Sequence, residues 1–353
     1  MMNTIRLLIL FGGVSNEHEV SRLSTQSILN AINTEKYEIT KVGITKDGKW
    51  MLTEASAEDI SNGKWEAYPT NVAVTVNLFG DKKGLVTKDG KEIEIDCVYP
   101  VMHGKNAEDG TMQGLWEIAG IPYVGPGVLA SSTGMDKITA KLVAGDTGVK
   151  QAKYYATDRY KFSSRPLIEL EEILEYFERK FPLFVKPANS GSSVGITMAH
   201  NDRELFEGIK VAAEVDHRIL IEEGIVGREI EVAVLGNRDP KASPVGEILS
   251  ANEMYDYEAK YLNAESRTRI VDDLNDEVIE EIQKTAIDIY KAFACKGLSR
   301  VDFFYTEKGE IIFNEINTLP GFTSISMYPQ LWKAAGIEYS ELIDKLIYLA
   351  MEE

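Results

Sequence analysis

The chain has 353 residues, a net charge of −18 and a hydrophobic content of 44%. This length exceeds the size at which one hydrophobic core is usual, so we expect two or three domains. A strongly acidic surface repels nucleic-acid phosphates and anionic lipid, which argues against nucleic acid or a membrane surface as a partner. The two cysteines, Cys97 and Cys295, are too few for a disulfide framework and too far apart for a zinc site, so we expect buried thiols in a reducing compartment.

No stretch approaches the roughly 18 to 20 apolar residues of a membrane span. The apolar run at 5–11 is short, and it lacks the cleavage region of a signal peptide. We therefore expect a soluble, cytoplasmic protein.

Segment 1–122 alternates strand-like and helix-like patterns, which predicts an open α/β sheet. We expect a buried strand at 5–11, an amphipathic helix at 21–33, a strand at 96–102, and a helix at 111–119 that Gly120 ends. Glycines and a proline at 125–127 then mark a break.

Two further segments follow, at 123–218 and 219–353. In the first we expect a helix at 135–144, a glutamate-rich helix at 168–180 whose charges form a solvated face, and a strand at 183–186. In the second we expect strands at 219–223 and 229–235, a long helix at 276–293, a hairpin, and a terminal helix from Tyr339.

The hairpin joins the β-rich runs 299–305 and 310–317 through a short loop. Side chains alternate along a strand, so Glu315 and Asn317 share a face, which on this pattern is also that of Ile311 and Phe313. A carboxylate on a half-buried face is costly unless it is paired or binds a metal. Oxygen ligands of this kind suit Mg²⁺, so we predict a magnesium site at Asp302, Glu315 and Asn317.

The register of the hairpin follows from its loop. If Tyr305 pairs with Glu310, two further pairs lie opposite each other: Arg300 with Glu315, and Asp302 with Phe313. The alternative is a surface hairpin whose charges merely pair with one another.

A loop rich in Gly and Ser, 187–195, follows Lys186 directly after a strand. Small residues let backbone amide groups wrap a phosphate, and Lys186 adds a point charge. The loop lacks the Gly-Lys-Ser/Thr ending of a Walker loop, and alone such a loop is more often a turn. The segment 220–225, followed by Glu229, can present backbone groups to adenine and a carboxylate to ribose, although by itself it is more often structural.

The order of these motifs resembles the ATP-grasp superfamily and, within it, the D-alanine–D-alanine ligases. The resemblance runs nearly end to end, through the segments 11–21, 103–114, 135–137, 255–261 and 314–327. It implies an α/β and α+β chain: an ATP-grasp fold with an N-terminal open parallel α/β domain. One departure is Ala107, where the family usually has glycine; a positive φ there would strain alanine.

The resemblance also implies the chemistry. ATP phosphorylates the carboxylate of one D-alanine, and the amine of a second D-alanine displaces the phosphate, giving D-alanyl-D-alanine for peptidoglycan synthesis. It implies two Mg²⁺ (or Mn²⁺) ions and a homodimer, and it leaves a requirement for a monovalent cation open.

The residue roles that the resemblance implies fall into three groups. Metal and phosphate binding is expected at Asp302, Glu315, Asn317, Lys137, Lys186 and Ser193, with Arg300 and the backbone of Gly321 stabilising the tetrahedral adduct. The adenine and ribose pocket is expected at Glu222, Glu223, Ile225 and Glu229. Amino-acid binding is expected at Glu17, His103, Ser192, Tyr261, Ser326 and Met327, with Lys260 reaching the γ-phosphate from a loop at 254–274 that closes over the site.

Three alternatives remain at this point. Glu17 alone could be a helix-start charge favoured by the dipole. The second substrate could be D-serine, whereas Tyr261 argues against D-lactate. A catalytically silent ATP-grasp binding protein would have a broken metal or Arg300 position, and here these positions are intact.

Overall fold

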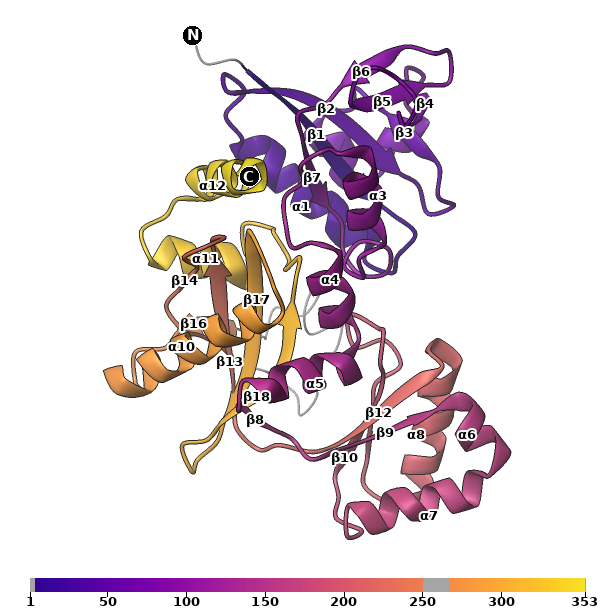
Figure 1. Cartoon of the computed structure of the whole chain (residues 1–353), viewed down its shortest axis with the longest axis vertical. Coiled ribbons are helices and arrows are strands. Elements are labelled where there is room, and N and C mark those ends of the chain that lie inside the picture. The colour runs from indigo at the N-terminus through magenta and orange to yellow at the C-terminus, as the bar shows by residue number, and fades with distance from the viewer. Residues whose placement is uncertain (1–3, 250–266, 353) are drawn as a thin grey trace.

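The computed structural model describes residues 4–249 and 267–352 and builds them around three sheets. Figure 1 shows the N-terminal sheet at one end of the molecule, a four-stranded sheet at the other, and the C-terminal sheet between them. No helix among these residues is long and apolar enough to cross a membrane.

The N-terminal sheet has the order β6-β5-β4-β3-β2-β1-β7. β1 runs parallel to β2 and β7, whereas β3 to β6 extend the sheet in antiparallel pairs. The expected parallel sheet is therefore present around β1, and the antiparallel extension was not predicted. Its elements are β1 (Ile5–Gly12), α1 (His18–Ala31), β2 (Tyr37–Ile44), β3 (Trp50–Leu52), α2 (Ala57–Ser61), the 3₁₀ helix η1 (Lys64–Ala67), β4 (Val72–Val76), β5 (Gly84–Thr87), β6 (Glu92–Glu94), β7 (Cys97–Val101) and α3 (Thr111–Ala119).

The four-stranded sheet is antiparallel, in the order β11-β10-β12-β9, and carries helices that pack on it. Two helices and a short strand precede it in the chain. The elements of this stretch are α4 (Val128–Met135), α5 (Lys137–Asp146), β8 (Lys150–Gln151), β9 (Tyr154–Asp158), α6 (Arg159–Ser164), α7 (Pro166–Tyr176), β10 (Leu183–Pro187), β11 (Thr197–Ala199), α8 (Asp202–Val215) and β12 (Arg218–Glu223).

The C-terminal sheet runs β16-β15-β13-β17-β18-β8, with β14 paired to β13. The long amphipathic helix α10 packs its apolar side on this sheet, through residues such as Ile282 and Ile289. The elements are β13 (Arg228–Leu235), β14 (Lys241–Ala242), β15 (Gly246–Leu249), β16 (Arg267–Ile270), α10 (Asp276–Ala292), β17 (Leu298–Tyr305), β18 (Ile311–Asn317), α11 (Met327–Ala334) and α12 (Tyr339–Met351).

The N-terminal sheet lies within the predicted segment 1–122, but the other two sheets do not divide at the predicted boundary of 218. β12 begins at Arg218 but completes the four-stranded sheet with β10 and β9. α4 and α5 contribute Ala130, Ala140 and Ala144 to the core of the C-terminal sheet, and β8 pairs with β18. The four-stranded lobe is thus inserted between two parts of the chain that build the C-terminal sheet.

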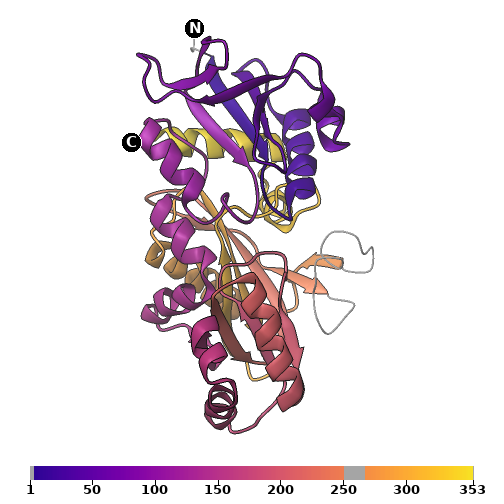
Figure 2. The same cartoon turned by 90° about the vertical axis from the view of Figure 1, so that its right-hand side faces the viewer.

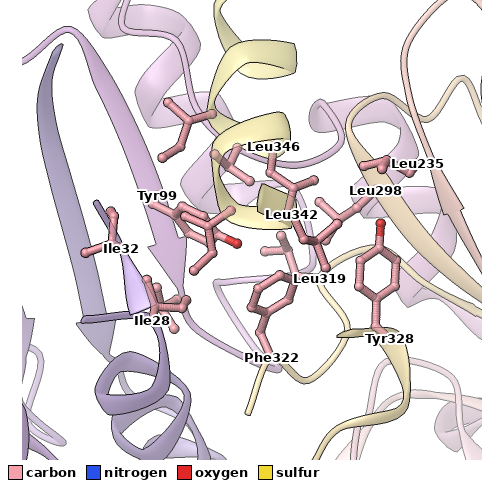
Figure 3. Packing of buried hydrophobic residues seen from close by; sticks show 14 of the residues in the cluster. Ile28, Ile32, Tyr99, Leu235, Leu298, Leu319, Phe322, Tyr328, Leu342 and Leu346 are labelled. Carbon is pink, nitrogen blue, oxygen red and sulfur yellow. The ribbon is translucent and has the colours of Figure 1, made fainter. Parts of the chain in front are cut away.

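The C-terminal helix α12 packs on the N-terminal domain, against α1 and β7 (Figure 2). Figure 3 shows Leu342 and Leu346 of α12 between Tyr99 on one side and Leu298 on the other. These side chains belong to one buried cluster that spans both domains. Each buried leucine contributes about 1.5–3 kcal/mol, so this cluster holds the N-terminal domain against the strands of the hairpin.

Most expected elements are present, and the helix at 111–119 has the predicted bounds, with Gly120 left-handed at φ 64°. The expected solvated face at 168–180 is present for most of its charges, but Glu169 is an exception. Glu169 is fully buried, where Thr157 Oγ1 donates to it at 2.6 Å and Lys161 Nζ lies 2.8 Å away. Helix α7 packs on the lobe with this carboxylate inward, which charge counting along the sequence does not reveal.

Two further expectations are settled by burial and backbone angles. Cys97 and Cys295 are free and buried, as predicted. Ala107 is buried in the core of the N-terminal domain, and the left-handed residues of its loop are Gly104, Asn106 and Gly110, at φ 73°, 68° and 90°. Alanine at 107 is therefore free of the backbone strain considered above.

Candidate functional site at the junction of the three sheets

The loop after β10 is curled by left-handed backbone. Ser192 and Ser193 have φ angles of 49° and 59°, and Gly195 has 76°. Asn189 anchors its start, because its backbone amide donates to Asp216 Oδ2 at 2.8 Å and its side chain donates to Asp136 Oδ2 at 2.9 Å. Small side chains and such backbone angles are typical of anion-binding loops.

On the side of the N-terminal domain, the loop contacts Glu17, which precedes α1. Ser192 Oγ donates to Glu17 Oε1 at 2.5 Å. The other carboxylate oxygen is enclosed by glycines: a Cβ built at Gly104 would lie 2.6 Å from it, and one at Gly191 would lie 3.0 Å from it. Glu17 is 8% exposed and makes no side-chain capping bond to α1, so the helix-start interpretation does not describe its contacts.

On the other side, Lys137 joins the loop to the hairpin. Its Nζ donates to the backbone oxygen of Ser190 at 2.7 Å and lies 3.7 Å from Glu315 Oε2. Lys137 begins α5, and Asp136 caps that helix through Thr139 N at 2.8 Å. The predicted phosphate loop and the predicted metal hairpin thus meet at one ammonium group.

The predicted register of the hairpin is wrong. Tyr305 pairs with Ile311, because the loop at 306–310 holds one residue more than expected. A second shift, a bulge, lies between Asp302 and Phe303, so Asp302 faces Glu315.

The bulge also changes which side chains share a face. The predicted face that combined Glu315 with Phe313 does not form: Phe313 packs with Phe303 in the core under α10. Asp302 and Glu315 turn to the opposite side of the sheet. The bulge therefore keeps Asp302 and Glu315 out of the core and still places them opposite each other.

Hydrogen bonds join Arg300, Asp302 and Asn317. Arg300 donates to both oxygens of Asp302, at 2.8 and 2.7 Å, and Asn317 Nδ2 donates to Asp302 Oδ2 at 2.9 Å. Arg300 Nη2 also lies 3.1 Å from Glu231 on β13, a buried carboxylate that sequence reasoning missed. Burial opposes the charge on Arg300, but Asp302 and Glu231 outweigh it and raise the pKa of Arg300.

Glu231 had a signal in the sequence: it lies two residues from Glu229, on the same face of a predicted strand. What the sequence does not give is the pairing of β13 with β17, which sets Glu231 opposite Asp302.

The donor set fits a magnesium ion that shares its coordination with phosphate. Asp302 and Glu315 face each other across β17 and β18, and Asn317 is hydrogen-bonded to Asp302. Over residues 4–249 and 267–352, no group of three His, Cys, Asp or Glu side chains forms a metal-binding cluster. Two carboxylates with an amide are compatible with Mg²⁺, which usually takes one or two carboxylates and completes its shell with substrate phosphates and water.

Lys186 forms an ion pair with Glu222. Its Nζ lies 2.6 Å from Glu222 Oε2, and Lys141 Nζ lies 2.5 Å from Oε1 of the same carboxylate. Burial favours the neutral acid, yet the two ammonium groups prevail and lower the pKa of Glu222 to about 2. Both Glu222 oxygens are thus engaged by lysines, and any contact of this residue with a nucleotide would come from its backbone.

The other residues expected at adenine and ribose lie nearby on the chain. Glu223 is exposed at the end of β12 and accepts from Lys153 N at 2.7 Å. Ile225 is half-buried in the connection to β13, where Glu229 pairs in register with Phe304.

A second loop, 318–326, faces the N-terminal domain. His103 is buried, with Nδ1 3.2 Å from the backbone oxygen of Leu319. Burial opposes its protonation, but the carboxylates of Glu108 and Glu17 outweigh this and raise the pKa of His103.

The same loop ends at α11. Ser326 Oγ accepts from Thr323 N at 3.1 Å, and a Cβ at Gly321 would lie 3.2 Å from that hydroxyl. Met327 is buried in the interdomain cluster, where it packs against Gly246 of β15. Its side chain is therefore a core residue, and only its backbone at the start of α11 faces the loop.

Tyr261 and Lys260, and most of the predicted loop 254–274, lie outside the described residues. A shallow cavity of about 450 Å³ lies elsewhere, in the four-stranded lobe beside α6 and α8, and its lining includes Arg159, Phe162 and Lys210.

Known proteins resemble the chain along its whole length. Two family descriptions match, D-ala D-ala ligase N-terminus over residues 6–126 and D-ala D-ala ligase C-terminus over residues 143–348. The D-alanine–D-alanine ligase of Acetivibrio thermocellus is 49% identical over 364 residues, which cover 98% of this chain and 96% of that protein. The solved structure of VanG D-Ala:D-Ser ligase from Enterococcus faecalis is 39% identical, with a TM-score of 0.88, and covers 99% of this chain and 100% of that one. D-alanine–D-alanine ligase from Bacillus anthracis complexed with ATP is 27% identical, with a TM-score of 0.71, and covers 99% of this chain and 98% of that one.

The three sheets, with a curled loop facing a carboxylate-bearing hairpin, define an ATP-grasp enzyme with an N-terminal α/β domain. Both family matches and the full-length relatives point to the same family within this class. The chain belongs to the D-alanine–D-alanine ligase family.

Proposed function

We propose that this chain joins two D-alanines into D-alanyl-D-alanine, with ATP converted to ADP and phosphate, for peptidoglycan synthesis. The observation that carries the proposal is the position of the loop at 190–195. It contacts Glu17 of the N-terminal domain through Ser192 and, through Lys137, the hairpin carboxylate Glu315. A phosphate on this loop would lie between an amino-acid pocket and a metal site.

Asp302, Glu315 and Asn317 would hold two Mg²⁺ (or Mn²⁺) ions, which neutralise phosphate charge when bound. Lys137 and Lys186, with Ser193 in the loop, would bind the phosphates. Arg300 is held rigidly by Asp302 and Glu231, so its guanidinium is already oriented to stabilise negative charge that develops during transfer. The backbone at Gly321 would assist it.

Glu17 would bind the ammonium group of the first D-alanine, with His103 beside the carboxylate. A neighbouring carboxylate raises the pKa of His103, so His103 can carry the positive charge that such a carboxylate requires. Ser192 would orient the second amino acid together with Tyr261, and Lys260 would reach the γ-phosphate. The carboxylate of the second amino acid would meet Ser326 and the backbone of Met327 at the start of α11, where helix amides favour an anion.

The reaction follows from leaving groups. A carboxylate cannot expel oxide, so its oxygen must first take the γ-phosphoryl group of ATP. The amine of the second D-alanine then attacks the carbonyl carbon, the carbon–oxygen bond to phosphate breaks, and the amine proton is lost. Water must be excluded meanwhile, because it would hydrolyse the acyl phosphate.

The proposed substrates are ATP and D-alanine, and the proposed setting is a homodimer in the cytoplasm. D-Serine is a second candidate for the acceptor, because the VanG D-Ala:D-Ser ligase is 39% identical to this chain. The 49% identity to a D-alanine–D-alanine ligase favours D-alanine.

The experiment is a turnover assay with purified protein, ATP, Mg²⁺ and D-alanine. We expect release of ADP that depends on D-alanine, with one dipeptide formed per ADP. ADP release that D-alanine does not stimulate, or no release at all, would rule out the proposed reaction.

A further inference from the structure

A buried group of three charges lies behind the phosphate loop, and one member has no role in the reaction described above. Lys141, on α5, is 2% exposed, and its Nζ contacts Glu222 Oε1 at 2.5 Å. Lys186 contacts the other oxygen of Glu222 at 2.6 Å. We call Lys141, Glu222 and Lys186 the lysine–glutamate triad.

The geometry of α5 links the triad to the site. Lys141 lies four residues after Lys137, which places both side chains on one face of the helix. Lys137 reaches the phosphate loop and Glu315, and Lys141 reaches the strand β12 one turn further on. One helix therefore carries two ammonium groups into the junction between the sheets.

The charges of the triad do not cancel. Two ammonium groups and one carboxylate leave a net charge of one positive unit in a buried place. Without Lys141, Glu222 and Lys186 would form a neutral pair, in which the carboxylate cancels the charge of Lys186. An isolated buried positive charge is costly in a protein without a ligand, whereas an ATP phosphate chain would compensate it.

We infer that Lys141 is a positioning residue for ATP: it neutralises Glu222 and so leaves the charge of Lys186 available to the phosphates. The inference rests on the proposed function only in taking ATP as the nucleotide. The competing explanation is that Lys141 merely joins α5 to β12, which would stabilise the fold and leave phosphate recognition unaffected.

The two explanations differ in what Lys141→Met does to different ligands. We expect AMP-PNP with Mg²⁺ to bind about tenfold more weakly, since one unit charge a few ångströms from a phosphate is worth at least that. Adenosine lacks phosphates, so its binding should change by less than about twofold. Isothermal titration calorimetry or competition by each ligand gives both constants without turnover.

A second variant reverses the effect. In Lys141→Met/Glu222→Gln the residue at 222 is neutral, so it no longer cancels the charge of Lys186, on which Glu315 and Glu229 act in every variant. We expect AMP-PNP affinity to return to within about threefold of wild type. Lys141→Arg keeps the charge and should also bind well, and Lys150→Met, an exposed lysine paired with Glu310, is the matched control.

The inference is overturned if Lys141→Met binds AMP-PNP as wild type does, if adenosine weakens to the same extent, or if the double variant stays as weak as the single one. A melting curve of each variant confirms that it is folded at the temperature of titration. Wild type that binds AMP-PNP but forms no dipeptide would instead overturn the proposed function.

Discussion

The substitution Glu315→Gln tests whether Glu315 binds a metal ion or only contributes a charge that stabilises the fold. Glu315 is 27% exposed in its side chain, and its Oε2 lies 3.7 Å from Lys137 Nζ. Such a partly exposed pair contributes about 0–1 kcal/mol to stability, so the free energy of unfolding should change little. If Glu315 holds a metal ion at the transferring phosphoryl group, turnover should fall by about 10²- to 10⁴-fold, or about 3–5 kcal/mol of barrier.

The assay has two arms. ADP release with saturating ATP and D-alanine gives turnover, and unfolding in urea gives stability. Glu310→Gln is a matched control on the same hairpin, because the carboxylate of Glu310 pairs with Lys150 at the surface, at 2.7 Å, and the change should alter neither quantity. Wild-type turnover in Glu315→Gln would refute the metal assignment, and a loss of more than about 2 kcal/mol of stability would show that the carboxylate is structural.

Three further predictions concern other parts of the molecule. Ser192→Ala removes the 2.5 Å hydrogen bond to Glu17 and should raise the KM for D-alanine about tenfold while the KM for ATP stays unchanged; equal changes in both would contradict the assigned pocket. Leu346→Ala empties a fully buried position in the interdomain cluster and should lower the free energy of unfolding by about 2–5 kcal/mol in a urea titration; a loss below about 0.5 kcal/mol would contradict the packing. The pKa of Glu222 is lowered to about 2 from an ordinary 4.5, so its contribution to stability is present above pH 4.5 and is lost as the pH falls through 2. Glu222→Gln should therefore melt below wild type at pH 7, with a difference that shrinks as the pH falls from 4.5 to 2; a difference constant with pH would contradict it.

The sequence predicted the individual elements of the site better than their contacts. Side-chain types and strand alternation sufficed to group Arg300, Asp302, Glu315 and Asn317, and the structure brings all four together. The register failed because hydrophobic alternation does not show a bulge: residues 311–317 read as one regular strand until Phe313 and Ile316 are found in the same core.

Contacts between distant segments were beyond local patterns. The helix at 339–351 reads as amphipathic, but nothing in it indicates that it packs on the N-terminal sheet, because one apolar face fits many partners. Lys141 could have been found, since its spacing from Lys137 puts both on one helix face. That Glu222 would lie within reach of it depends on the packing of α5 on β12 through Ile138 and Leu220, which the sequence alone does not specify.

The most direct test of the account is mass analysis of the products formed from an equimolar mixture of D-alanine, D-serine and D-lactate with ATP and Mg²⁺. The account predicts D-alanyl-D-alanine as the main product, with one ADP released per dipeptide. A main product containing D-serine or D-lactate would contradict the proposed acceptor, and ADP without any ligated product would contradict the proposed ligation.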